Sequence, residues 1–231
     1  MYISNLKKIV NNDYLSRDII NSSYSKISFS QFGEDLLINK IFKKIDYGKF
    51  LDLGSFHPIH FSNTFLLYLR GWRGINVDGN KSMIELTKKT RPEDISIHAF
   101  LNSSEGKSYY ITNANNPAMN RISDKIENVK EDEEFLEVKT ETIQNIIEKN
   151  LHFFNDQFYY LNIDLEFKDL DILQQIDFKQ IRPILITIES HDLNSNELIK
   201  KTLEKNGYDF YSYINPTAFY LLKEFKENSF K

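Results

Sequence analysis

The chain has 231 residues, a formal net charge of −4, 41% hydrophobic and 14% aromatic residues, and no cysteine. This length and apolar content suffice for one substantial core, and the acidic balance argues against nucleic-acid binding, which needs a basic surface. The absence of cysteine excludes disulfides, thiolate metal sites and cysteine nucleophiles, so any metal must be held by oxygen or imidazole ligands.

The sequence contains no recognisable membrane span or secretion signal. No run of about 18 apolar residues is present. Residues 1–25 include Lys7, Lys8 and Asp13 and lack a continuous apolar stretch, so they do not resemble a signal peptide. We therefore expect a cytoplasmic protein whose partner is a small molecule, with no membrane span.

Apolar runs alternate with helical patterns in the first half of the chain. Residues 1–29 read as an N-terminal appendage, before a single domain over 30–231. The pattern then predicts, in order, a helix over 34–45, a strand over 50–53, a helix over 62–70, a strand over 75–78, a helix over 82–90 and a strand over 95–101. Asn80 is the expected N-cap of the third helix.

The second half begins with a polar segment and then returns to alternation. Residues 102–137 read as irregular, and their acidic cluster at 131–134 as a solvated surface. The predicted elements that follow are a helix over 142–150, a strand over 158–164, a helix over 169–176, a strand over 184–189, a helix over 196–206, and strands over 208–214 and 217–222. This alternation predicts an α/β fold with a mostly parallel sheet, helices on both faces and an antiparallel final hairpin.

Polar residues stand at the end of each predicted core strand. Asp52 and Asp78 end the first two, and Asp164 and Glu189 end two later ones. In such sheets ligands bind outside the carboxyl ends of the strands, where the strand order reverses. These carboxylates are therefore expected along one ligand-binding edge.

The pair Asp52 and Asp78 indicates a nucleoside ligand. Gly54 would let the backbone approach the ligand, and the acid 26 residues after Asp52 could accept hydrogen bonds from ribose hydroxyls. Phe56 and Pro58 stand where a dinucleotide-binding turn needs glycine. The turn therefore favours a nucleoside without phosphates, S-adenosylmethionine rather than NAD, and disfavours a Rossmann oxidoreductase.

Six segments in this order and spacing resemble the FkbM family of S-adenosylmethionine-dependent methyltransferases. They are Ser30–Asp35, Phe50–Pro58, Ser62–Thr64, Gly71–Asp78, Asn162–Glu166 and Pro183–Glu189. The resemblance covers roughly residues 28–225. It implies a Rossmann-like class I methyltransferase fold, with a seven-stranded sheet and a reversed final strand.

The resemblance also implies the reaction and the acceptor. The expected reaction is methyl transfer to oxygen, to a hydroxyl of a sugar or nucleotide-linked sugar in bacterial surface polysaccharide (capsule or lipooligosaccharide) biosynthesis. Asp52 would fix the methionine amino group and Asp78 the ribose hydroxyls. The expected cofactor-binding residues are Gln31, Asp52, Gly54, Ser55, Asn63, Asp78, Asn102 and Asp164.

Proton removal from the acceptor leaves two alternatives open. A positioned histidine or carboxylate could act as the base, with His191, Asp164 and Glu166 as the candidates. A divalent cation, Mg²⁺ or Mn²⁺, held by Asp164 and Glu189 could instead lower the pKa of the hydroxyl. We expect the 102–137 segment and the N-terminal segment to shape the acceptor pocket or a homodimer contact.

One position departs from the family pattern. Phe167 stands where the family usually has glycine. Two further alternatives therefore stay open, a non-catalytic or regulatory member that binds the cofactor, and a methyltransferase that acts on a natural product or another small molecule.

Overall fold

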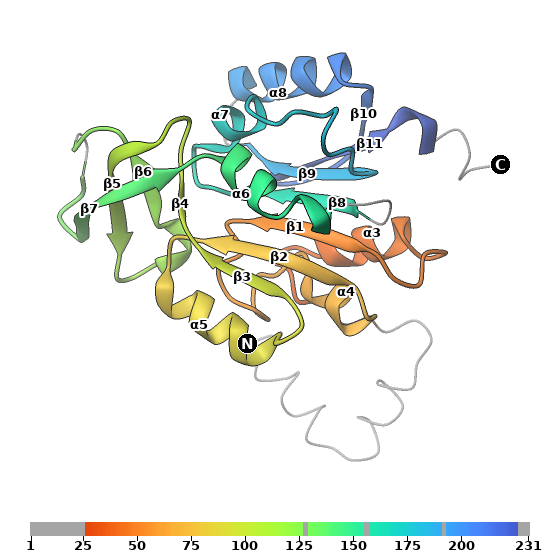
Figure 1. Ribbon diagram of the computed structural model, residues 1–231, viewed down its shortest axis with the longest axis horizontal. Helices are drawn as coiled ribbons and strands as arrows, with labels where there is room; N and C mark the ends of the chain where they lie inside the picture. Colours follow the sequence, from red (N-terminus) through yellow and green to blue (C-terminus); the bar gives the residue numbers. More distant parts are fainter. Residues whose placement is uncertain (1–25, 127–128, 155–157, 191–192, 226–231) are drawn as a thin grey trace, which may run out of the picture.

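A computed structural model describes residues 26–126, 129–154, 158–190 and 193–225. Its centre is a seven-stranded sheet with the strand order β10-β11-β9-β8-β1-β2-β3 (Figure 1). The strands are β1 (Lys49–Leu53), β2 (Arg73–Asp78), β3 (Ile95–His98), β8 (Phe158–Ile163), β9 (Leu185–Glu189), β10 (Tyr208–Ile214) and β11 (Thr217–Leu222). All neighbours pair in parallel except β11, which is antiparallel to both β9 and β10. The predicted fold class and reversed final strand are confirmed.

Helices cover both faces of this sheet (Figure 1). They are α3 (Glu34–Ile41), α4 (Phe65–Leu69), α5 (Lys81–Thr90), α6 (Ile143–Lys149), α7 (Asp169–Leu173) and α8 (Leu193–Lys205). Helices α3 and α4 bury apolar side chains in one cluster around Trp72, and α6, α7 and α8 bury theirs in the other. Helix α5 packs against β2 and β3. The sheet is thus apolar on both sides, as a parallel sheet requires.

Several helix boundaries differ from the predictions. Helices α3, α4 and α7 end earlier or begin later than the apolar pattern indicates, because the flanking residues form turns. The side chain of Asn80 accepts hydrogen bonds from the backbone of Ser82 and Met83, so the predicted cap of α5 is confirmed. Thr142 caps α6 in the same way.

The segment that we expected to be irregular forms a second sheet, so that expectation is wrong. Its order is β4-β7-β5-β6, with β4 (Phe100–Leu101), β5 (Gly106–Asn113), β6 (Arg121–Ser123) and β7 (Glu133–Glu141), and the short 3₁₀ helix η1 (Pro117–Met119) joins β5 to β6. The strand expected over 95–101 is confirmed for Ile95–His98 and wrong beyond it, because the chain leaves the main sheet after His98 and pairs with β7 from Phe100.

The charged surface of β7 explains why its pattern was misread. Most β7 side chains are exposed, and the strand is held by its ladder with β5 rather than by burial. The acidic cluster is only partly a solvated surface. Within it, the carboxylate of Glu133 is almost completely buried and accepts two hydrogen bonds from Arg121, at 2.6 and 3.0 Å. A second short 3₁₀ helix, η2 (Leu151–Phe153), follows α6.

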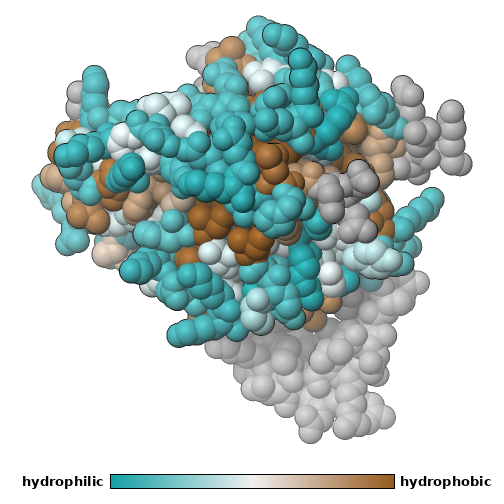
Figure 2. Space-filling view, in the orientation of Figure 1, coloured by the Kyte–Doolittle hydropathy of each residue, from teal (hydrophilic) through white to brown (hydrophobic). Residues whose placement is uncertain are grey.

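The described surface is largely polar, with apolar side chains scattered over the second sheet and near the centre of the face in Figure 2. On β7, Phe135 and Leu136 are the exposed apolar residues. Among the described helices, none has the length and hydropathy that crossing a membrane requires. Before α3, Phe29 packs edge-on against Phe65 at 4.8 Å, so this part of the expected appendage contacts the main sheet's helical layer.

Gly74 lies directly opposite Phe50 on neighbouring strands. A Cβ at this glycine would lie 1.8 Å from the ring of Phe50, which is completely buried. We expect Gly74→Ala to lower the free energy of unfolding by about 1–3 kcal/mol through overpacking. Combining it with Phe50→Leu should cost less than the sum of the two single changes, as measured by urea denaturation. Additive costs would show that this contact does not limit the packing.

Candidate active site

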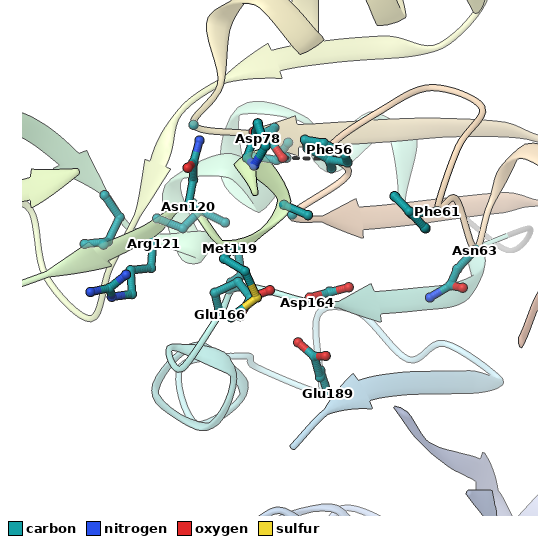
Figure 3. Close-up of a pocket in the computed structure, with 18 of the residues that line it drawn as sticks. Phe56, Phe61, Asn63, Asp78, Met119, Asn120, Arg121, Asp164, Glu166 and Glu189 are labelled. Carbon is teal, nitrogen blue, oxygen red and sulfur yellow. Dashed lines mark hydrogen bonds between the residues drawn. The ribbon is translucent and has the colours of Figure 1, made fainter. Parts of the chain in front are cut away.

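A cavity of about 370 Å³ opens at the carboxyl ends of the central strands (Figure 3). Its walls come from the segments that follow β1, β2, β8 and β9, and from residues 116–122 of the second sheet. The strand order reverses between the neighbouring strands β1 and β8. From β1 the chain continues to β2 towards one edge of the sheet, and from β8 it continues to β9 towards the other edge. This is the place where an open α/β sheet binds its ligand.

Gly54 allows the floor of the cavity to form. Its φ of +79° favours glycine, and a Cβ there would lie 1.6 Å from the backbone oxygen of Asp164. The chain segments after β1 and β8 therefore lie too close together to leave room for a side chain at position 54. The glycine that was predicted to let a ligand approach the backbone also lets the end of β8 approach it.

Asp78 is held at the cavity wall by two backbone groups. Its carboxylate accepts hydrogen bonds from the N–H of Phe56 at 2.7 Å and the N–H of Asn80 at 2.6 Å. Burial raises the pKa of Asp78 to about 6, although both hydrogen bonds act to lower it. Because a carboxylate has four acceptor positions, Asp78 can still accept from a ligand.

Asp52 lies beneath the cavity and does not line it. Its carboxylate accepts from Thr64 Oγ1 at 2.7 Å and from Asn162 Nδ2 at 2.9 Å. Burial raises its pKa, and the hydrogen bonds and the nearby Arg91 guanidinium oppose that shift. The structure therefore ties this carboxylate to two neighbouring chain segments.

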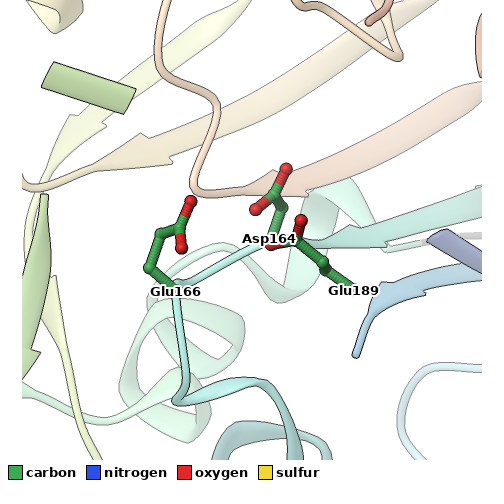
Figure 4. Close-up of side chains that lie close together, drawn as sticks. All are labelled: Asp164, Glu166 and Glu189. Atoms are coloured by element: carbon green, nitrogen blue, oxygen red, sulfur yellow. The ribbon is translucent and has the colours of Figure 1, made fainter. Parts of the chain in front are cut away.

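Three carboxyl groups meet on the opposite wall (Figure 4). Asp164, Glu166 and Glu189, called here the carboxyl triad, place one oxygen each within 4.8 Å of the others. Burial raises the pKa of Glu166 to about 8 and that of Glu189 to about 7, with neighbouring carboxylates adding to both shifts. Asp164, hydrogen-bonded to Glu189, has its pKa raised well above the usual range for the same reasons. The triad can hold protons near neutral pH or offer oxygen ligands to a cation.

The structure brings most of the predicted site residues together. Those that line the cavity are Gln31, Gly54, Asn63, Asp78, Asp164, Glu166 and Glu189. Ser55 and Asn102 lie outside the lining, the former buried and the latter hydrogen-bonded to Ser108 and Asp124 in the second sheet. His191 falls outside the described residues.

The sequence analysis expected the 102–137 segment to shape a pocket, but it did not identify the sheet or the residues that form this wall. Residues 116–122, including Met119 and Arg121, line the cavity (Figure 3). Asn120 fixes this segment, because it donates to Tyr110 Oη at 3.0 Å and accepts from the Asn113 N–H at 2.8 Å. The run of aromatic and β-branched residues over Tyr109–Thr112 in β5 was the one sequence signal that could have indicated this strand.

A family model matches more than half of the chain. Residues 52–210 match the family model described as the methyltransferase FkbM domain. Among solved structures, a TehB-like SAM-dependent methyltransferase from Corynebacterium glutamicum is 13% identical, with a TM-score of 0.41, over 93% of this chain and 96% of that one. Among curated proteins, no significant match is found.

The raised pKa values of the triad predict how stability depends on pH. Between about pH 5 and 8 the folded protein keeps carboxyl protons that the unfolded chain has released, so its stability falls as pH rises. In EDTA, the Tm should fall between pH 6 and 8 more steeply for the wild type than for Glu189→Gln, measured by scanning fluorimetry. The exposed Glu131→Gln serves as control and should keep the wild-type slope. If Tm fell equally steeply with pH in the wild type and in Glu189→Gln, the carboxyl groups of the triad would not be repelling one another as proposed.

Proposed function

The chain belongs to the FkbM methyltransferase family, and from that membership we propose that it is an S-adenosylmethionine-dependent O-methyltransferase. The observation that carries the proposal is one cavity in which Asp78 stands on one side and the carboxyl triad on the other, with Gly54 on the floor between them. A nucleoside-binding wall and a proton-accepting wall therefore face the same space.

The cofactor fits the β1–β2 side of the cavity. The ribose hydroxyls would donate to Asp78, whose orientation the Phe56 and Asn80 N–H groups already fix. The adenine would lie towards Ala99–Leu101, where Phe100 and Tyr110 supply an aromatic wall with ring centroids 4.9 Å apart. Asp52 then acts as a positioning residue, because its hydrogen bonds are made to Thr64 and Asn162.

The carboxyl triad would take the acceptor proton. The bound cofactor supplies an electrophilic methyl group on its sulfonium sulfur. The acceptor oxygen would attack this methyl carbon as the carbon–sulfur bond breaks, which would release S-adenosylhomocysteine, and its proton would pass to a triad carboxylate. Glu189, with a pKa of about 7, is the group best matched to this task at neutral pH. Asp164 supports it through their shared hydrogen bond.

A hydroxyl-rich acceptor suits the remaining polar wall. Gln31 and Asn63 line the cavity and offer both donors and acceptors. We therefore retain the sugar or nucleotide-linked sugar of a bacterial surface polysaccharide as the proposed acceptor. Such precursors would place the enzyme in the cytoplasm.

A divalent cation is the alternative way to handle the same proton. The three triad oxygens are the ligand type that Mg²⁺ and Mn²⁺ prefer. Bound there, the cation would lower the pKa of the acceptor hydroxyl and balance the carboxylate charge.

Removing the charge of Asp78 should weaken cofactor binding. Asp78→Asn is expected to raise the Kd for S-adenosylmethionine about 10- to 100-fold, the usual effect of losing hydrogen bonds to a charged group. Isothermal titration calorimetry measures it, with the exposed Glu85→Gln as the charge-matched control. A Kd within twofold of the wild type would show that Asp78 does not bind the ribose.

Removing the proposed base should remove turnover and spare binding. With S-adenosylmethionine and a library of nucleotide sugars, the wild type should release S-adenosylhomocysteine in EDTA, with matching product mass. Glu189→Gln should lower kcat about 10²- to 10⁴-fold, while its Kd for the cofactor stays near that of the wild type.

The metal alternative predicts that the same assay gives no activity in EDTA. If activity vanishes in EDTA and returns with Mg²⁺, the triad is a cation site. A protein that binds the cofactor and turns over no acceptor in either condition would be a non-catalytic family member.

A further inference from the structure

Phe61 is an exposed aromatic ring on the wall of the cavity. It lines the cavity and is 58% exposed. No described aromatic ring or cation packs against it, whereas Phe56, Phe65 and Phe100 each have an aromatic neighbour. A large apolar side chain left open to solvent in a cavity is typical of a ligand contact.

The backbone of Phe61 is strained. Its φ is +58°, in the left-handed region that bulky residues avoid. Such a conformation persists only where the surroundings impose it, and it concentrates at ligand-binding sites. Here the neighbours impose it, since the Ser62 N–H donates to the Phe29 carbonyl at 3.0 Å and Arg91 donates to Ser62 Oγ at 2.7 Å.

The anchors of the loop place Phe61 on the β8 side of the cavity. At one end of the loop, Phe56 is bound to Asp78 on β2. At the other end, Asn63 donates to Asn162 on β8 at 3.2 Å, two residues before Asp164. Figure 3 likewise draws Phe61 beside Asn63 and well apart from Asp78. The ring therefore belongs to the side of the cavity where the acceptor would bind.

We propose that Phe61 is a specificity-determining residue on which the acceptor stacks, and that the acceptor is a pyranose ring. One face of a β-D-glucoside, β-D-galactoside or β-D-mannoside carries only C–H groups, those of C1, C3 and C5, and can lie on an aromatic ring. Its hydroxyls point outward along the edge, where Asn63 and the triad supply polar partners. This inference rests on the proposed function, because it assigns the acceptor half of the same cavity.

The test uses the full-length protein with defined probes. Methyl β-D-glucopyranoside, methyl β-D-galactopyranoside and methyl β-D-mannopyranoside stand for the pyranose, catechol for a planar phenolic acceptor, and S-adenosylhomocysteine for the cofactor. Saturation-transfer difference NMR measures the glycosides and catechol, and calorimetry measures S-adenosylhomocysteine. Phe32→Ala is the matched control, since Phe32 is also 58% exposed and does not line the cavity.

At least one glycoside should bind the wild type and Phe32→Ala equally. In Phe61→Ala its saturation transfer should fall at least fivefold, and Phe61→Trp should restore it. The Kd for S-adenosylhomocysteine should stay within twofold throughout. The Tm of Phe61→Ala should also stay near the wild-type value, because the ring is exposed.

Other results overturn the inference. Binding of no glycoside to the wild type, equal glycoside binding to Phe61→Ala, or Phe61-dependent binding of catechol alone would reject the pyranose assignment. A weaker S-adenosylhomocysteine Kd in Phe61→Ala would move Phe61 to the cofactor side. If S-adenosylhomocysteine fails to bind even the wild type, the proposed function itself fails, and this result is distinct from the others.

Discussion

The buried guanidinium of Arg91 is the interaction on which the geometry of the site depends. Only 1% of this residue is exposed, yet it donates to the Pro58 carbonyl, Ser62 Oγ and Thr64 Oγ1 and lies 3.9 Å from Asp94. A buried cation is costly unless its donors are paired, and breaking such a pair typically costs about 3–5 kcal/mol. The loop after β1 must therefore close around Arg91, and that closure sets the cavity wall.

The same network joins the loop to the place where the strand order reverses. Thr64 accepts from Arg91 and donates to Asp52, which in turn accepts from Asn162 on β8. Asn162 Oδ1 also accepts from Thr187 on β9 at 2.7 Å. Hydrogen bonds in such a chain strengthen one another in a low-dielectric interior. The strand ends that carry the cavity residues are thus fixed from below by one connected polar network.

The sequence predicted what local patterns determine and missed what distant partners determine. The seven core strands and the cap at Asn80 follow from apolar runs and short-range hydrogen bonds. The second sheet was not predicted because β7 is largely solvent-facing and its paired residues on β5 lie 20 to 34 positions away. Asp52 was expected to contact a ligand, since its position at a strand end is visible and its partner Asn162, 110 residues later, is not.

Strain and charge repulsion are concentrated at one edge of this fold. Four described residues other than glycine have positive φ values, and three of them line the cavity, namely Phe56, Phe61 and Glu166. The carboxyl triad adds mutual repulsion at the same edge. Each strained residue costs about 1–3 kcal/mol, which a marginally stable domain must recover elsewhere. The recovery comes from the two apolar clusters and the Arg91 network below. A ligand that offsets this repulsion and covers the Phe61 ring would therefore stabilise the protein as it binds.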